Sequence, residues 1–265
     1  MLHFTDHLQS KIKLQNFPKR IVSLVPSQTE LLCDLGLENE VVGITRFCVH
    51  PKKWRSTKAI IGGTKNFDFE AIEKLQPDLI IGNKEENYQE GITRLQQKFP
   101  VWMSDIYNID DTLKTITDIG NICNRKQEAK ILSNEILSEK QKFKTQNYNL
   151  FKDKTAAYFI WKKPYMVAAS NTFINAMLRE FGIKNLFENF ERYPEFTQNE
   201  LQKYLPDFVF LSSEPYQFTE KHFQEFQTIF PNAKIVLVDG EMFSWYGSRI
   251  KQSYKYFKEL SQKLL

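Results

Sequence analysis

One arrangement of strand and helix signals occurs twice along this chain of 265 residues. In each copy a short helical segment ends at a Pro-Asp pair, and a compact apolar run follows at once: Pro77-Asp78 before residues 79–81, and Pro206-Asp207 before residues 208–211. Short apolar runs that alternate with helical segments are typical of strands buried in a parallel sheet. The repeat therefore predicts an α/β protein with two Rossmann-like lobes. The alternative is that both copies belong to one doubly wound sheet.

The segment between the two copies predicts a single long helix. Residues 124–147 contain neither glycine nor proline, and apolar residues recur near one helical face, at Ala129, Leu132, Ile136 and Phe143. Such a helix is about 36 Å long and is stiffer than an extended linker. We therefore expect lobes at residues 1–123 and 148–265, joined by a rigid helix, with a largely pre-formed ligand cleft between them.

Composition excludes several classes of protein. The net charge is only +4 and no stretch concentrates basic residues, which argues against nucleic-acid binding. Apolar runs such as residues 79–81 are far shorter than the ~18 residues that cross a bilayer, so no membrane insertion is expected. Three cysteines do not suggest a disulfide framework. The first residues carry no secretory signal. We therefore expect a cytoplasmic protein, or a periplasmic one if a leader has been removed.

Several segments together resemble the helical-backbone metal receptor superfamily. These segments are residues 20–32, the Phe69-Glu70-Ala71-Ile72 segment that leads to Pro77-Asp78, the long helix and the second lobe. The superfamily comprises the class III substrate-binding proteins that deliver cobalamin, haem or ferric siderophores to ABC importers, and the resemblance covers about residues 18–265. It implies two Rossmann-like lobes joined by a rigid helix, with the ligand held between them.

The resemblance also implies a function and partners. The protein would bind a metal chelate such as a corrinoid, haem or a ferric siderophore. It would not be an enzyme and would need no resident cofactor. It would dock on an ABC-importer permease, and we expect a monomer. Family members dock through one glutamate on each lobe. Glu70 matches in the first lobe, whereas Asn199 takes the matching place in the second and Glu200 follows it. Glu70 and Glu200 are therefore the expected docking residues.

The cobalamin-binding member of the family lines its cleft with tryptophans, and this chain departs from that pattern. Thr64 and Asn83 stand at two of the corresponding places, and Tyr193 is the aromatic residue retained. Flat packing of a corrin ring against indoles is therefore less expected here than binding of another chelate.

Ligands of parallel α/β lobes bind at the loops that leave the carboxyl ends of the strands. In the first lobe the candidate ligand-binding residues on these loops are Ser27, Gln28, Phe47, Cys48, His50, Thr64, Lys65, Asn83, Lys84, Glu85 and Glu86. In the second lobe they are Trp161, Tyr165, Asn171, Tyr193, Glu214, Tyr216, Phe243, Trp245, Tyr246 and Arg249. Aromatic area combined with a few polar groups suits a mid-sized ligand, and Arg249 could clamp a ligand carboxylate.

Cys48 and His50 form the one Cys-x-His pair, and three interpretations of it remain open. They could coordinate a metal together with Glu85 or Glu86, they could form a nucleophilic dyad, or they could simply pack in a loop. Dinucleotide and phosphate-loop motifs and the Gly-x-Ser-x-Gly elbow are missing, so catalysis has little support. The alternative function is a cytoplasmic protein that has kept the receptor fold and binds a metal or small metabolite, or acts on one as an enzyme.

Overall fold

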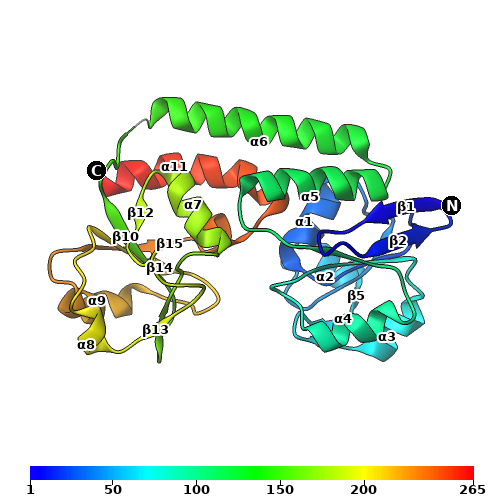
Figure 1. The fold of residues 1–265 in the computed structure, drawn as a ribbon, viewed down its shortest axis with the longest axis horizontal. Helices are drawn as coiled ribbons and strands as arrows, with labels where there is room; N and C mark the ends of the chain where they lie inside the picture. Colours follow the sequence, from blue (N-terminus) through cyan, green and yellow to red (C-terminus); the bar gives the residue numbers. More distant parts are fainter. Residues whose placement is uncertain (148) are drawn as a thin grey trace. The chain divides into compact units, whose positions relative to one another are not determined.

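The computed structural model describes residues 1–147 and 149–265 (Figure 1). The described chain divides into two compact units, Met1–Leu137 with Tyr246–Arg249 (unit 1) and Ser138–Trp245 with Ile250–Leu265 (unit 2). Residue 148, the first residue of the expected second lobe, lies outside the described part. The division differs from the expected bounds in two ways. It falls within the connecting helix, and it assigns four residues near the carboxyl terminus to the first unit.

Unit 1 is built on a five-stranded parallel sheet in the order β5-β4-β3-β8-β9. Its strands are β3 (Ile21–Ser23), β4 (Val41–Ile44), β5 (Ala59–Ile60), β8 (Leu79–Asn83) and β9 (Val101–Ser104). Every residue of β3, β8 and β9 is buried, as continuous apolar runs predict for a sheet covered on both faces. The helices are α1 (Pro26–Asp34), α2 (Trp54–Thr57), α3 (Phe69–Leu75), α4 (Gln89–Gln96) and α5 (Ile109–Ile122).

Two hairpins complete unit 1. Strands β1 (Leu2–Thr5) and β2 (Lys11–Leu14) pair antiparallel near the amino terminus, and β6 (Gly62–Gly63) pairs with β7 (Asn66–Phe67). The first hairpin is joined to the main sheet because the His7 backbone N–H donates to the Met103 carbonyl oxygen over 3.0 Å.

Unit 2 contains a six-stranded mixed sheet in the order β13-β11-β10-β14-β15, with β12 beside β10. Parallel pairing joins β10 (Thr155–Trp161), β12 (Lys184–Asn185), β14 (Phe208–Ser212) and β15 (Lys234–Val238), whereas β11 (Tyr165–Val167) and β13 (Glu195–Phe196) add antiparallel. The helical segments are α7 (Phe173–Phe181), α8 (Gln198–Leu201), η1 (Glu220–His222), α9 (Phe223–Ile229), α10 (Glu241–Ser244), η2 (Gly247–Arg249) and α11 (Ile250–Leu264). The short η2 belongs to unit 1. The predicted α/β class with parallel sheets is confirmed.

The repeated Pro-Asp pairs do the same structural work in both units. The Asp78 carboxylate accepts hydrogen bonds from the backbone N–H groups of Lys19 and Arg20, over 2.8 and 2.9 Å, immediately before β3. The Asp207 carboxylate accepts one from the Thr155 N–H, over 2.8 Å, at the first residue of β10. Each aspartate therefore satisfies backbone donors where the neighbouring strand begins, which gives a physical reason for the repeat.

The long connecting helix is α6 (Lys126–Gln146), close to the predicted 124–147. Its predicted apolar face is buried at Ala129, Leu132, Ile136 and Phe143. The first three belong to unit 1, whereas Phe143 packs within unit 2 beside Phe181 and Phe257, at ring-centroid distances of 6.2 and 5.8 Å. No helix in the described residues is sufficiently long and apolar to cross a membrane.

Candidate functional site

The carboxyl end of β8 carries a buried polar network centred on Asn83. Its side-chain oxygen accepts hydrogen bonds from the backbone N–H groups of Glu85 and Glu86, over 2.9 and 3.1 Å, and its amide donates to Ser104 Oγ over 2.9 Å. Asn83 was predicted to contact ligand, but it is buried and its polar atoms have protein partners. Its role in this structure is to shape the loop that carries the two glutamates.

Gln28 and Ser27, also predicted to contact ligand, are likewise buried at the start of α1. The Gln28 amide donates to Ser104 Oγ over 2.5 Å and to the Gly82 carbonyl oxygen over 3.2 Å. These bonds hold α1 against the carboxyl ends of β8 and β9. The structure therefore favours an internal role for Gln28, and Ser27 is buried next to it.

An exposed rim at the carboxyl edge of unit 1 combines other predicted residues. Phe47 is 54% exposed. Its ring packs closely on Gly63, because a Cβ atom added to that glycine would lie only 3.1 Å from a ring carbon. Lys65 Nζ donates to the Glu85 carbonyl oxygen over 2.5 Å, and the Asn87 amide donates to the Thr64 carbonyl oxygen over 3.1 Å. These bonds join the β6–β7 turn to the loop after β8. We call Phe47, Thr64, Lys65 and Glu85 the unit 1 rim.

The structure does not support the metal or nucleophile interpretation of Cys48. Its side chain is fully buried, and its sulfur lies 3.0 Å from Thr29 Oγ1 and 3.2 Å from Thr45 Oγ1. Burial raises the pKa of the Cys48 thiol, which disfavours the thiolate that both roles require. Across residues 1–147 and 149–265, no group of three or more His, Cys, Asp or Glu side chains is placed to hold a metal ion.

A second exposed rim lies at the carboxyl edge of the sheet in unit 2. Trp161 ends β10 and is 40% exposed, and Tyr216 follows β14 and is half-buried. Their rings meet edge to face, with centroids 5.6 Å apart and an interplanar angle of 71°. The exposed indole and the adjacent phenol offer apolar area together with a polar atom, as ligand sites in α/β sheets require. We call Trp161 and Tyr216 the unit 2 rim.

His222 supports this rim, and sequence reasoning missed it. Tyr216 Oη lies 3.2 Å from His222 Nε2, and the Thr219 backbone N–H points at His222 Nδ1 over 3.0 Å. Nδ1 also lies 3.0 Å from the Thr219 carbonyl oxygen, so contacts on both ring nitrogens hold the imidazole beside Tyr216. Thr219-x-x-His222 has the spacing of a capping box, which is the signal that could have revealed it.

Tyr165 contacts protein rather than the unit 2 rim. Its hydroxyl donates to one oxygen of the Glu225 carboxylate, and Lys162 Nζ donates to the other. Burial, followed by the hydrogen bond to Glu225, raises the pKa of Tyr165. Because Glu225 already accepts this hydroxyl hydrogen, Tyr165 anchors the β10–β11 turn to α9.

Glu214, Phe243 and Trp245 form an internal support behind the carboxyl edge of unit 2. One Glu214 carboxylate oxygen accepts hydrogen bonds from Ser244 Oγ over 2.7 Å and from the Trp245 indole N–H over 2.9 Å. Burial raises the pKa of the Glu214 carboxyl. Phe243 is fully buried, with its ring centroid 5.2 Å from that of Tyr158. The three residues, which were predicted to contact ligand, therefore contact other protein groups and hold α10 in place.

Arg249 is paired within unit 1 instead of presenting its guanidinium to a ligand. Its Nε and Nη2 donate to the two carboxylate oxygens of Glu30, over 2.8 and 2.7 Å. The Arg249 side chain is 5% exposed and that of Glu30 is 10% exposed. Tyr246 is buried in the same returning segment. The bidentate geometry predicted for Arg249 is present, but its partner is a protein carboxylate.

The remaining predicted residues lie near the surface of their own units. Arg192 joins two of them, because its Nη1 donates to the Asn171 carbonyl oxygen over 2.7 Å and its guanidinium carbon lies 5.4 Å from the Tyr193 ring centroid. Lys84 Nζ pairs with Asp105 over 2.7 Å. His50 and Glu86 are half-buried.

Helices α3 and α8, which precede the two Pro-Asp pairs, each begin at a residue whose side chain caps the helix. Asp68 caps α3 by accepting from the Ala71 N–H, and Thr197 caps α8 by accepting from the Glu200 N–H. Counted from the cap, Glu70 and Asn199 both stand at the second helical position. Glu200 stands at the third and completes a capping box, and hydrogen bonds from Thr197 lower its pKa. Glu70 is the exposed carboxylate at the matched position.

Comparison with known proteins gives consistent results. The sequence model of the periplasmic binding protein family matches residues 21–228. The chain is 25% identical to the uncharacterised ABC transporter substrate-binding lipoprotein YvrC of Bacillus subtilis, over 77% of this chain and 67% of the relative. It is 22% identical to the vitamin B12-binding protein of Vibrio parahaemolyticus, over 77% of this chain and 74% of that protein.

Solved structures extend the similarity over nearly the whole chain. A possible iron-binding periplasmic protein of Staphylococcus epidermidis has a TM-score of 0.79 at 25% identity, with 93% of this chain and 98% of that chain covered. The petrobactin-binding protein YclQ of Bacillus subtilis has a TM-score of 0.83 at 16% identity, with 99% and 98% covered. The second comparison shows a shared fold.

Proposed function

Since the chain belongs to the periplasmic binding protein family, as a substrate-binding protein of the ABC-transporter type, we propose that it binds a metal chelate: a corrinoid, haem or a ferric siderophore. The observation that carries this proposal is the pair of exposed aromatic rims. Phe47 stands at the carboxyl edge of the sheet in unit 1, and Trp161 with Tyr216 at that of unit 2. Ligands of open α/β sheets bind at this edge.

The chemistry of the rims suits a chelate. Exposed aromatic rings provide flat apolar area, and the Tyr216 hydroxyl, held beside His222, adds a polar group that can both donate and accept hydrogen bonds. Some relatives are named for vitamin B12, and a structural neighbour for petrobactin. The relatives are binding proteins rather than enzymes, and the buried thiol of Cys48 gives no support to the catalytic alternative.

A panel titration tests the proposed ligand class. We expect one of haemin, cyanocobalamin, a ferric hydroxamate or a ferric catecholate to bind with a dissociation constant below about 10 μM, or −7 kcal/mol. Calorimetry and quenching of tryptophan fluorescence would measure it, with the metal-free siderophores as matched controls. Dissociation constants above about 100 μM for every chelate would contradict the proposal.

We propose a permease as the protein partner, contacted in this chain through Glu70 rather than Glu200. In an importer reconstituted with this protein, Glu70→Ala should lower ligand-dependent ATP hydrolysis and leave the urea unfolding midpoint unchanged. Glu200→Ala removes half of a capping box and should lower that midpoint with little effect on ATP hydrolysis. Equal effects of the two variants in both assays would contradict this assignment.

The proposed compartment follows the relatives. One of them is named a lipoprotein, and structural neighbours are named periplasmic. Of the two expected locations, these names favour the exported one. Recovery of the native protein with the cytosol after gentle fractionation of its source cells would contradict it.

A further inference from the structure

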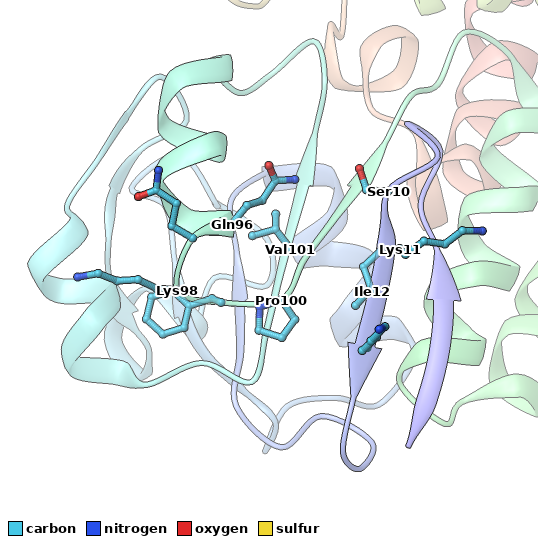
Figure 2. Close-up of a pocket in the computed structure, with 10 residues that line it drawn as sticks. Ser10, Lys11, Ile12, Gln96, Lys98, Pro100 and Val101 are labelled. Atoms are coloured by element: carbon cyan, nitrogen blue, oxygen red, sulfur yellow. The ribbon is translucent and has the colours of Figure 1, made fainter.

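Unit 1 contains a cavity of about 500 Å³ that lies outside its carboxyl-edge rim. Figure 2 shows it between β2 and the segment that enters β9. The apolar residues of its lining are Ile12, Phe99, Pro100 and Val101, and the lining also includes three lysines: Lys11, Lys13 and Lys98. Because Val101 is the first residue of β9, the cavity borders the amino end of the sheet, whereas ligand sites in such sheets lie at the carboxyl end.

One wall of the cavity is an open strand edge. β9 is the last strand of its sheet and pairs with β8 alone in that sheet. The Pro100 carbonyl oxygen accepts a hydrogen bond from the Ile80 N–H, and the Ser104 carbonyl oxygen accepts one from the Lys84 N–H. In this part of the chain, therefore, every second residue directs its backbone groups to β8. The backbone groups of Val101 and Met103 therefore point to the other side. The Met103 carbonyl oxygen accepts a hydrogen bond from the His7 N–H. Within the described residues, the backbone N–H and carbonyl groups of Val101 have no hydrogen-bond partner.

The opposite wall is also an open strand edge. β2 pairs with β1 in antiparallel register, and the Asp6 N–H donates to the Ser10 carbonyl oxygen over 3.1 Å just beyond the paired residues. Because hydrogen-bonded and non-hydrogen-bonded pairs alternate in an antiparallel ladder, the backbone groups of Lys11 and Lys13 point away from β1. The cavity is thus bordered by two strand edges that each offer backbone donors and acceptors.

The charge around these edges is positive. The lining residues include three lysines and no carboxylate. Lys98 Nζ pairs with Glu73 over 2.6 Å, and Lys11 Nζ donates to the Thr5 hydroxyl over 3.2 Å. Lys13 is exposed and has no ion-pair partner among the residues that the structure describes. A bound segment that carries carboxylates would supply the missing charge.

We propose that this groove binds an extended acidic peptide segment of a partner protein, which adds as a strand to the open edge of β9. Backbone hydrogen bonds to Val101 would provide the pairing, and apolar side chains of the segment would pack against Ile12 and Pro100. The lysines would select segments with alternating glutamate or aspartate. An open edge with partly buried apolar flanks is the feature that strand addition uses.

The probe is a blocked hexapeptide of alternating valine and glutamate, titrated into the intact protein. We expect saturable changes in the backbone amide NMR signals of Val101, Lys11 and Lys13. A hexapeptide with lysine in place of glutamate should bind at least tenfold more weakly. A peptide N-methylated at alternate residues on the pairing edge should also bind at least tenfold more weakly, because it cannot complete the ladder.

Charge-matched variants of the protein complete the test. Lys13→Glu should weaken binding of the glutamate peptide about tenfold or more, whereas Lys52→Glu, at an exposed site outside the groove, should leave it unchanged. Three results would overturn the proposal: no binding, equal binding of the N-methylated peptide, or the same amide shifts with inorganic phosphate alone. The last would identify a simple anion site. Chelate binding is measured separately, so either proposal can fail alone.

Discussion

Arg249→Met is expected to lower the free energy of unfolding by about 3–5 kcal/mol, because it leaves the buried Glu30 carboxylate without its bidentate partner. Burial raises the pKa of Glu30, and the nearby Arg249 charge opposes that rise. Without the guanidinium, the folded-state pKa should rise further above its unfolded value. An acid with a raised folded pKa loses stability as pH rises through that pKa, so the deficit should be larger at pH 7 than at pH 5. Urea unfolding at both pH values measures it.

The double variant Glu30→Met/Arg249→Met is the control for this prediction. It replaces both charges with apolar side chains of similar length, so it should recover most of the lost stability. If Arg249→Met alone costs less than about 1 kcal/mol, or if the double variant is as unstable as the single one, the pair does not fix the returning segment to α1.

Trp161→Ala is expected to weaken binding of the tightest chelate in the panel about 30-fold, which corresponds to about 2 kcal/mol. The indole is exposed at the carboxyl edge of unit 2, so its truncation should remove ligand contact while changing the free energy of unfolding little. Tyr216→Phe should weaken the same chelate about tenfold, because it removes the hydroxyl but keeps the ring. Calorimetric titration measures both effects.

The matched control is Leu205→Ala. Leu205 is 78% exposed in the same unit, but it precedes β14 and so lies at the amino edge of the sheet. Its truncation should leave chelate affinity unchanged. If Trp161→Ala and Leu205→Ala bind the chelate equally well, the unit 2 rim is not the ligand surface.

Much of the fold could be predicted because its signals are local. The apolar runs at residues 79–81 and 208–211 are sufficiently short and continuous to indicate buried parallel strands, and the structure places both in such sheets. The glycine-free, proline-free stretch predicted α6, and the spacing of its apolar residues identified the face that is buried. The antiparallel strands β11 and β13 were missed, because a strand of two or three residues carries little periodic signal.

Several candidate side chains that were expected on loops belong to helices, such as Gln28 in α1 and Phe243 in α10, and the sequence did not separate side chains that face solvent from those that face the protein. Asn83 ends β8 and Lys84 follows it directly, yet the first is buried and the second exposed. Loops lack a regular period, so alternation gives no guidance there. Partners distant in the sequence decide the matter: Ser104 for Asn83, and Glu225 for Tyr165.

By itself the sequence determined the α/β class and the continuous connecting helix, since each depends on residues close together in the chain. Only the tertiary structure decided that Arg249 pairs with Glu30, that Cys48 lies between two threonines, and that His222 supports Tyr216. The physical reason is that the charge state and availability of a polar side chain depend on burial and on its hydrogen-bond partners. In the first two of these pairings the partners come from separate elements that folding brings together.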